Sequence, residues 1–239
     1  MIKLSNLFGC PKCKGELIII KHKYICNSCK DTYQIVSEIP IFLKDDKSNS
    51  YSKYWDKGWK NRSDIGDQNF HKKPKSDDYE DIKNVLLKVK EIKSPVTSIN
   101  MQKENETLLN IGCGMMEAPV IIMMGINNYI GIDFSYTAVK SSLESIKKLN
   151  GHGVTLQANA ESLPIKSETI DQVYSAGVLH HTPNIETTFD EIYRVLKPSG
   201  RCIIGLYRTY SLKFIVAKII GTLKGLLSKK GYAWYAFTE

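Results

Sequence analysis

The sequence predicts an α/β protein with a mostly parallel sheet and helices on both faces. Strand-like apolar runs at 107–111 and 128–132 enclose a glycine turn and a segment of helix length. From residue 107 onward, strand-like and helix-like segments alternate, which is typical of parallel strands joined by helical crossovers. The 239 residues are enough for one ordinary domain and a small second one.

The first apolar run ends in Gly112-Cys113-Gly114, and the second ends in Asp133. Glycines at such a turn let backbone N–H groups approach a ligand where a Cβ would collide. An acid about 20 residues further on, at the end of the next strand, is typical of a nucleoside-binding βαβ unit, where it holds the ribose hydroxyls. We therefore predict a nucleoside cofactor at Gly112, Gly114 and Asp133.

Periodicity and turn residues predict the other elements. Ser135 is expected to cap a helix over 136–149, which ends at Asn150-Gly151. An amphipathic helix over 77–93 is expected to precede the first strand of the sheet. The remaining expected elements are helices near 117–125 and 185–196 and strands at 153–157, 171–175 and 201–207.

Four cysteines form two Cys-x2-Cys pairs, called knuckles below, with twelve residues between the pairs. They are Cys10, Cys13, Cys26 and Cys29. A unit of thirty-odd residues buries too little surface to fold alone, and four thiolates at this spacing match a structural, tetrahedral Zn²⁺ site. Two disulfides are the alternative, but they need an oxidising compartment that nothing in the sequence indicates.

The chain divides by composition into four segments. We expect a zinc-ribbon domain over 1–43, a polar linker over 44–76, a cofactor-binding domain over 77–207 and a basic, apolar helix with a tail over 208–239. The aromatic residues of the linker (Tyr51, Tyr54, Trp55 and Trp59) fit either a short helix packed on the neighbouring domain or a cap over the ligand site. Cys113 and Cys202, outside the knuckles, lie in apolar strand-like runs and are expected to be buried.

The formal net charge is +8, and residues 192–238 contain bases but no acid. Such a segment fits a solvated surface, a phosphate-bearing partner or an anionic membrane surface, the last through residues 211–230. The N-terminus has no signal pattern, and no segment is as long and apolar as a membrane span. We therefore expect a cytoplasmic protein.

The ordered motifs of the second half resemble the class I S-adenosylmethionine-dependent methyltransferases of the broad methyltransferase-11 type. The matching segments are 109–114, 131–135, 158–164, 171–175, 178–181 and 191–200. The resemblance implies a Rossmann-like sheet and S-adenosylmethionine as the cofactor. Residues 8–43 resemble the zinc ribbon of the small activator proteins of tRNA methyltransferases, which implies zinc.

The resemblance also implies roles for individual residues. Gly112 and Gly114 would lie under the methionine and ribose, and Asp133 would accept from the ribose hydroxyls. His180, just after the fourth strand, is the candidate general base. The other implied cofactor contacts are Asn110 at the methionine amino group, Phe134 on the adenine, Asn159 and Ala160 at the adenine edge, and Ala176 at the methyl-donor end.

The predicted function is methyl transfer to a small-molecule or glycan-type acceptor. One alternative is an RNA methyltransferase whose ribbon contacts RNA. Another is a non-catalytic protein that binds a protein partner, because Asn110 and Met116 replace the usual acid and third glycine of the first motif. The family normally adds two antiparallel strands after the fifth helix, and the segment after residue 207 leaves room for one at most. The sheet is therefore expected to lack its last two strands, or the chain to be a fragment.

Overall fold

The computed structural model of the protein describes residues 3–43, 52–60, 95–99 and 105–206. The described residues up to 205 belong to one compact unit. The helix predicted over 77–93 and the membrane-surface segment predicted over 211–230 lie outside the described residues. None of the helices in the described ranges is long and apolar enough to span a membrane.

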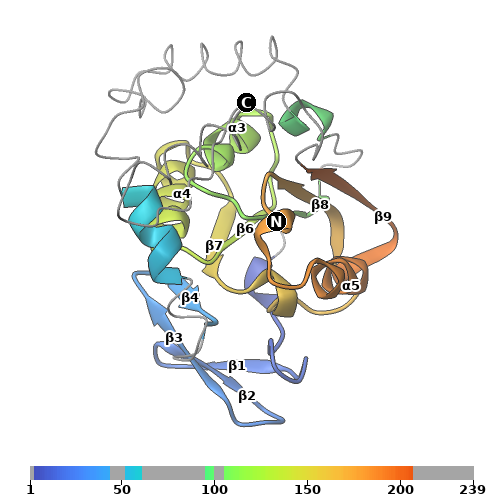
Figure 1. The fold of residues 1–239 in the computed structure, drawn as a ribbon. Coiled ribbons are helices and arrows are strands. Elements are labelled where there is room, and N and C mark those ends of the chain that lie inside the picture. Colours follow the sequence, from blue (N-terminus) through green and yellow to red (C-terminus); the bar gives the residue numbers. More distant parts are fainter. Residues whose placement is uncertain (1–2, 44–51, 61–94, 100–104, 207–239) are drawn as a thin grey trace, which may run out of the picture. The chain divides into compact units, whose positions relative to one another are not determined.

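In the described part of the chain, one sheet of nine strands has the order β1-β2-β3-β4-β7-β6-β5-β8-β9 (Figure 1). Its second part, from β7 to β9, is parallel throughout, which confirms the predicted α/β class. The strands of that part are β5 (Leu108–Ile111), β6 (Tyr129–Asp133), β7 (Gly153–Gln157), β8 (Ile170–Ala176) and β9 (Leu196–Gly205). The strand that carries the glycine turn, β5, lies between β6 and β8, so the predicted cofactor residues are near the middle of the parallel part.

Helices cover both faces of this parallel part. They are α3 (Glu117–Met123), α4 (Tyr136–Lys148) and α5 (Ile185–Val195). Strand residues alternate between two buried clusters: Leu108 and Tyr129 pack with α3, and their neighbours Leu109 and Ile130 pack with α5. This alternation is what a strand buried on both faces produces.

Side-chain caps fix where the helices begin. The Ser135 side chain accepts a hydrogen bond from the Ala138 N–H (3.1 Å), which confirms Ser135 as the N-cap of α4. Asn184 caps α5 in the same way, through the N–H of Thr187 (3.0 Å). Short 3-10 helices complete the described chain: η1 (Leu4–Leu7), η2 (Pro95–Ser98), η3 (Ala160–Ser162) and η4 (Leu179–His181).

The N-terminal strands form the antiparallel half of the same sheet. They are β1 (Leu17–Ile20), β2 (Lys23–Cys26), β3 (Thr32–Val36) and β4 (Ile39–Ile41). Strand β4 pairs in parallel with β7 at Ile41 and Gln157, and the Phe42 N–H donates to the Gln157 carbonyl (2.8 Å). Phe8 bridges to Ile165 and packs in the same buried cluster as the α5 face of the sheet. The small N-terminal unit therefore shares both sheet and core with the larger one.

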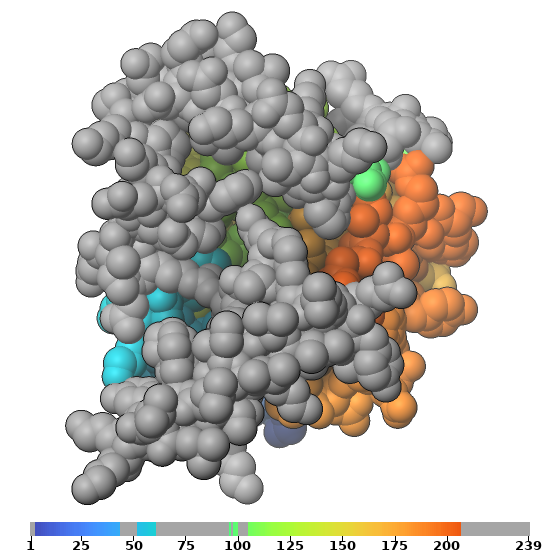
Figure 2. All heavy atoms as spheres, turned by 45° about the horizontal axis from the view of Figure 1, so that its top comes forward, coloured from blue at the N-terminus to red at the C-terminus, as the bar shows by residue number. Residues whose placement is uncertain are grey.

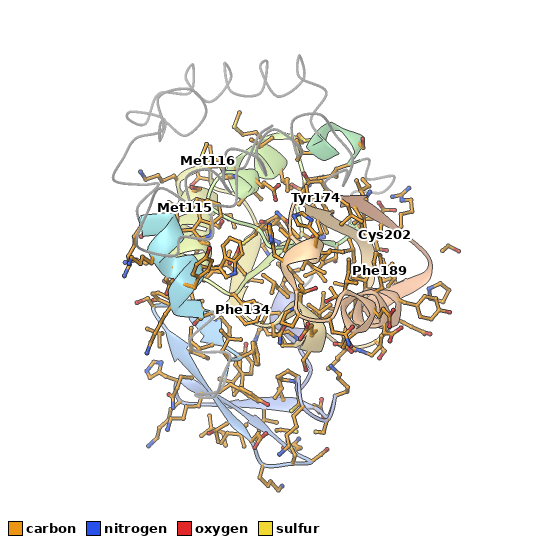
Figure 3. All side chains as sticks on the ribbon, in the orientation of Figure 1. Met115, Met116, Phe134, Tyr174, Phe189 and Cys202 are labelled. Atoms are coloured by element: carbon orange, nitrogen blue, oxygen red, sulfur yellow. The ribbon has the colours of Figure 1, made fainter. Side chains whose placement is uncertain are left out.

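Strand β9 begins five residues earlier than expected, because residues 197–200, which precede the expected strand, form an irregular part of it in which Ser199 has a φ of 68°. It is the last strand of the described sheet, and the predicted loss of two further strands concerns residues outside the described part. Cys113 is buried as expected, but the expectation for Cys202 was wrong. Cys202 is exposed because β9 is an outer strand of the described sheet (Figure 3).

Candidate functional site

The glycine turn after β5 has a conformation that only glycine adopts easily. Gly112 and Gly114 have φ angles of +73° and +52°. A Cβ on Gly112 would lie 2.2 Å from a methyl group of Val178, and a Cβ on Gly114 would lie 3.0 Å from the Trp59 ring. The turn is pinned to β6, since the N–H groups of Gly112 and Cys113 both donate to the Ile132 carbonyl. The backbone of the turn is thus a close-contact surface.

Asp133, at the end of β6, faces this turn. One carboxylate oxygen accepts from the Gly114 N–H (3.0 Å) and the other from the Ser135 N–H (2.8 Å). Burial raises the pKa of Asp133 to about 6, and the nearby charge of Asp56 adds to the shift. Hydroxyl donors on the remaining lone pairs would stabilise the ionised carboxylate, which fits the predicted contact with a ribose.

Met116 stands where the family pattern has a third glycine. Its φ of −108° and ψ of −23° are ordinary right-handed values, so a side chain causes no backbone strain there. Met115 and Met116 lie where the chain enters α3 (Figure 3). Met116 therefore leaves the conformation of the glycine turn intact.

Residues 52–60 are helical and bind the segment that follows β6. The Ser52 hydroxyl donates to the Phe134 carbonyl (2.9 Å). A carboxylate oxygen of Asp56 accepts from the Ser135 hydroxyl (2.5 Å) and from the Thr137 N–H (3.0 Å), at the start of α4. Atoms of this helix lie at the molecular surface in Figure 2.

The aromatic residues of this helix reach the predicted site. The Trp59 ring contacts the glycine turn at Gly114, and the Trp55 ring lies 5.3 Å from that of His181. The segment is thus a short packed helix, and the ring of Trp59 lies against the glycine turn. A cap over the ligand site stays a prediction.

The loop after β8 carries His180, the predicted general base, in η4. The rings of His180 and His181 lie 4.1 Å apart. Burial lowers the pKa of His180, and burial together with the charge of His180 lowers the pKa of His181 to about 4. Both imidazoles are therefore neutral at pH 7, the form a base needs, and Val178 brings their loop against Gly112.

The other predicted contacts lie at the same ends of the strands. Ala176 is the last residue of β8, and Phe134 directly follows β6. Asn159 caps η3, and its side-chain carbonyl accepts from the Glu161 N–H (2.8 Å). Ala160 is the buried first residue of that turn. Their cofactor roles stay predictions.

The four knuckle cysteines converge on one point. Their Sγ atoms all lie within 4.8 Å of one another, with 3.6 Å between Cys10 and Cys29 and 3.4 Å between Cys13 and Cys26. Zn–S bonds of about 2.3 Å in a tetrahedron need sulfurs roughly 3.8 Å apart. Burial opposes ionisation of Cys26, but the N–H groups of Cys29 and Ser28 outweigh it and lower its pKa to about 6. Both geometry and donor set fit a metal ion.

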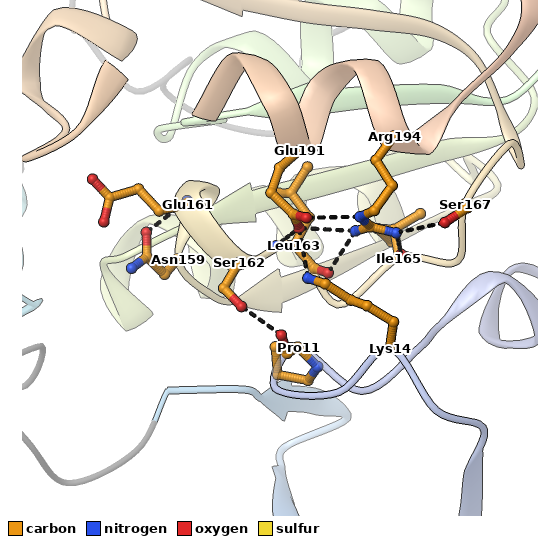
Figure 4. A network of polar contacts seen from close by, with 10 residues as sticks. All are labelled: Pro11, Lys14, Asn159, Glu161, Ser162, Leu163, Ile165, Ser167, Glu191 and Arg194. Atoms are coloured by element: carbon orange, nitrogen blue, oxygen red, sulfur yellow. Dashed lines mark hydrogen bonds and ion pairs between the residues drawn. The ribbon is translucent and has the colours of Figure 1, made fainter. Parts of the chain in front are cut away.

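A polar network joins the first knuckle to the parallel part of the sheet (Figure 4). The Lys14 ammonium lies 2.7 Å from the Glu191 carboxylate on α5, which also accepts from Arg194 and from the Leu163 N–H. The Ser162 hydroxyl donates to the Pro11 carbonyl (2.6 Å). The knuckle is therefore tied to the loop that carries the predicted adenine contacts.

Sequence reasoning missed several of these residues. The carboxylates of Glu117, Asp56 and Glu191 each accept a hydrogen bond from a segment distant in the sequence. Glu117 lies in the first turn of α3, where acids are common because they interact favourably with the helix dipole. Its position in the sequence therefore gave no separate indication of a functional role.

Residues 109–204 match the family model described as "Methyltransferase domain". The chain is 34% identical over 128 residues to an uncharacterised protein of Methanocaldococcus jannaschii. The aligned segment covers 53% of this chain and 46% of that protein. It is 27% identical over 180 residues to a demethylmenaquinone methyltransferase of Anoxybacillus flavithermus, covering 69% and 74% respectively. The chain thus spans less than half the length of the first relative.

The structure of a putative methyltransferase from Bacillus halodurans aligns with a TM-score of 0.44 at 23% identity, over 59% of this chain and 58% of that one. The family match spans β5 to β9 almost completely. The part of the chain from β5 to β9 therefore resembles a methyltransferase domain in sequence.

Proposed function

We propose that the protein transfers the methyl group of S-adenosylmethionine to a small-molecule acceptor. The observation that carries the proposal is the glycine turn held against Asp133 inside the matched domain. The cofactor supplies an electrophilic methyl group, so the protein mainly has to align the acceptor with it and exclude water. The demethylmenaquinone methyltransferase relative, whose named acceptor is a small molecule, supports this acceptor class over RNA.

The residues of this chain support that task in distinct ways. Gly112 and Gly114 present a bare backbone surface, and Asp133 offers an ionisable acceptor beside it. Trp59 covers the turn, and Trp55 packs against the imidazole of His181, so aromatic rings shield this end of the sheet. His180 and its neutral ring remain our candidate for accepting a proton from a hydroxyl acceptor.

We further propose that the four knuckle cysteines hold a structural Zn²⁺ ion. A site closed by four thiolates leaves no position for substrate, so the ion would stabilise the N-terminal strands and take no part in chemistry. Because β4 extends the sheet at β7, an intact ribbon supports the edge of the cofactor-binding domain. An RNA-binding role for the ribbon is an outcome that the experiment below distinguishes.

The first test measures binding and transfer with the purified chain. S-adenosylhomocysteine should increase the free energy of unfolding by RT ln(1 + [L]/Kd) and so raise the melting temperature. Asp133→Asn should weaken binding at least tenfold, because the amide cannot replace a carboxylate that accepts from donors on several sides. Asp190→Asn, at an exposed position of α5, is the matched control and should bind as the wild type does.

Incubation with methyl-labelled cofactor and cell extract then identifies the acceptor class. Label in the low-molecular-weight fraction supports the proposal, whereas label in RNA would replace the small-molecule acceptor with the RNA alternative. A folded protein that shows no melting shift at millimolar ligand would refute the enzyme and favour the partner-binding alternative.

A further inference from the structure

The start of α3 holds a group of buried hydrogen-bond acceptors that has fewer donors than acceptor positions. Asn110, at the end of β5, is fully buried, and its amide N–H₂ donates to the Glu117 carboxylate (3.0 Å) and to the Tyr129 hydroxyl (3.2 Å). The Tyr174 hydroxyl donates to the other carboxylate oxygen of Glu117 (3.3 Å). Among the described residues, the side-chain carbonyl of Asn110 has no hydrogen-bond partner.

The surplus of acceptors is large. A carboxylate offers about four acceptor positions and a carbonyl two, and only two of these six receive a donor here. Within the described part of the chain, no lysine or arginine pairs with Glu117. A buried acceptor without a donor costs about 1–3 kcal/mol, and an unpaired buried charge costs more. Such a cluster is typical of a site completed by a ligand that brings donors and positive charge.

The cluster lies beside the predicted cofactor site. Asn110 and Glu117 flank the glycine turn on its two sides in the sequence, and they meet beneath it. Gly114, inside the turn, is the residue whose N–H binds Asp133. Glu117 is partly exposed as a residue, whereas its carboxyl group is buried beside the turn.

We propose that Glu117 and the side-chain carbonyl of Asn110 bind the α-ammonium group of the methionine part of S-adenosylmethionine. The assignment rests on the proposed function. An ammonium brings three N–H donors and one positive charge, which match the vacant acceptors and the negative charge that Glu117 carries when ionised. Asn110 alone is neutral, so the charge that holds the ammonium comes from Glu117.

Protonation gives a second readout of this contact. Burial raises the pKa of Glu117 to about 8, although the hydrogen bonds from Asn110 and Tyr174 oppose the shift and the charge of Asp133 adds to it. Tyr129, Tyr174 and Cys113, which surround it, have pKa values raised by burial and stay neutral at pH 7. An ammonium beside Glu117 favours its ionised form, so ligand binding at pH 7 should release a proton from Glu117.

The test compares two ligands by titration calorimetry at pH 7. S-adenosylhomocysteine carries the amino-acid end, whereas 5′-methylthioadenosine has the same adenosine and thioether without it. We expect Glu117→Gln to weaken S-adenosylhomocysteine ten- to hundredfold and to change 5′-methylthioadenosine less than twofold. Glu144→Gln, an exposed substitution on α4, should alter neither affinity.

The double variant Asn110→Asp with Glu117→Gln returns a carboxylate to the cluster and should recover at least part of the lost affinity. Repeating the titration in buffers of different ionisation enthalpy should show proton release in the wild type that Glu117→Gln abolishes. Equal S-adenosylhomocysteine affinities in Glu117→Gln and wild type would overturn the assignment, as would equal losses for both ligands. If neither ligand binds the wild type, the proposed function itself fails.

Discussion

The strongest stability prediction concerns Glu191, the centre of the network that joins the first knuckle to α5. Its carboxylate accepts four hydrogen bonds: two from Arg194 (2.7 and 2.8 Å), one from Lys14 (2.7 Å) and one from the Leu163 N–H (2.7 Å). Burial opposes ionisation of Glu191, but these cations outweigh it and lower its pKa. For Lys14, burial outweighs the attraction of Glu191 and lowers the pKa.

Because ion pairing outweighs burial at Glu191 but not at Lys14, substitutions at the two positions should reduce the free energy of unfolding by different amounts. The Glu191 side chain is 11% exposed, so Glu191→Gln leaves two cations without a buried countercharge, and we expect a loss of about 3 kcal/mol. The Lys14 side chain is 32% exposed, and Lys14→Met leaves Glu191 still bound to Arg194. Replacing Lys14 also removes the cost of burying its ammonium group, and this gain offsets part of the lost hydrogen bond. We therefore expect a loss of about 1 kcal/mol or less in the free energy of unfolding.

Urea denaturation followed by tryptophan fluorescence and circular dichroism measures both values. The double variant should be more stable than Glu191→Gln alone, because it removes one of the two unpaired cations. Lys12→Met in the same knuckle is the matched control, since Lys12 is 60% exposed and lies 3.5 Å from Asp31. A loss for Lys14→Met as large as that for Glu191→Gln would refute the reasoning, as would a double variant less stable than either single one.

Three further predictions concern the turn, the knuckles and the remaining cysteines. Gly112→Ala should destabilise the protein more than Gly125→Ala. Both positions have positive φ, but only at Gly112 would a Cβ collide with Val178. The difference between the unfolding free energies of the two variants measures the cost of that collision. A strong chelator should lower the melting temperature and release close to one zinc ion per chain, as measured by a metal-sensitive dye; an unchanged melt with no zinc released would contradict the zinc proposal. In zinc-loaded protein, a thiol reagent should modify exposed Cys202 quickly and buried Cys113 only on unfolding, since burial raises the pKa of the Cys113 thiol; mass spectrometry of the labelled peptides checks this.

The local elements of the parallel sheet were largely predictable from the sequence. Apolar runs, periodicity and turn residues placed β5, β6, β7 and β8 within one residue of their observed bounds, and Ser135 was correctly identified as the cap of α4. These signals are short-range, because strand burial and helix capping depend on residues within a few positions of one another. The positions of Gly112, Gly114 and Asp133 follow from the same local pattern.

Other features had no local signal. The helix at residues 52–60 lies in a polar segment, and its Asp56 binds the start of α4 across about 80 positions of the chain. Cys202 looked buried because its neighbours are apolar, yet an outer strand leaves one side open. Exposure of this kind depends on which strand ends at the edge of the sheet, and local periodicity does not report it.

By itself, the sequence determined the class of the fold, the glycine turn with its acid and the four-cysteine pattern, because each depends on residue types at short, fixed spacings. Only the tertiary structure decided that β4 continues the sheet at β7, since any exposed strand edge offers the same backbone groups to a partner. It also decided that Glu117 lies against Asn110 with acceptors to spare. That contact depends on how the turn closes onto the sheet, which spacing alone does not determine.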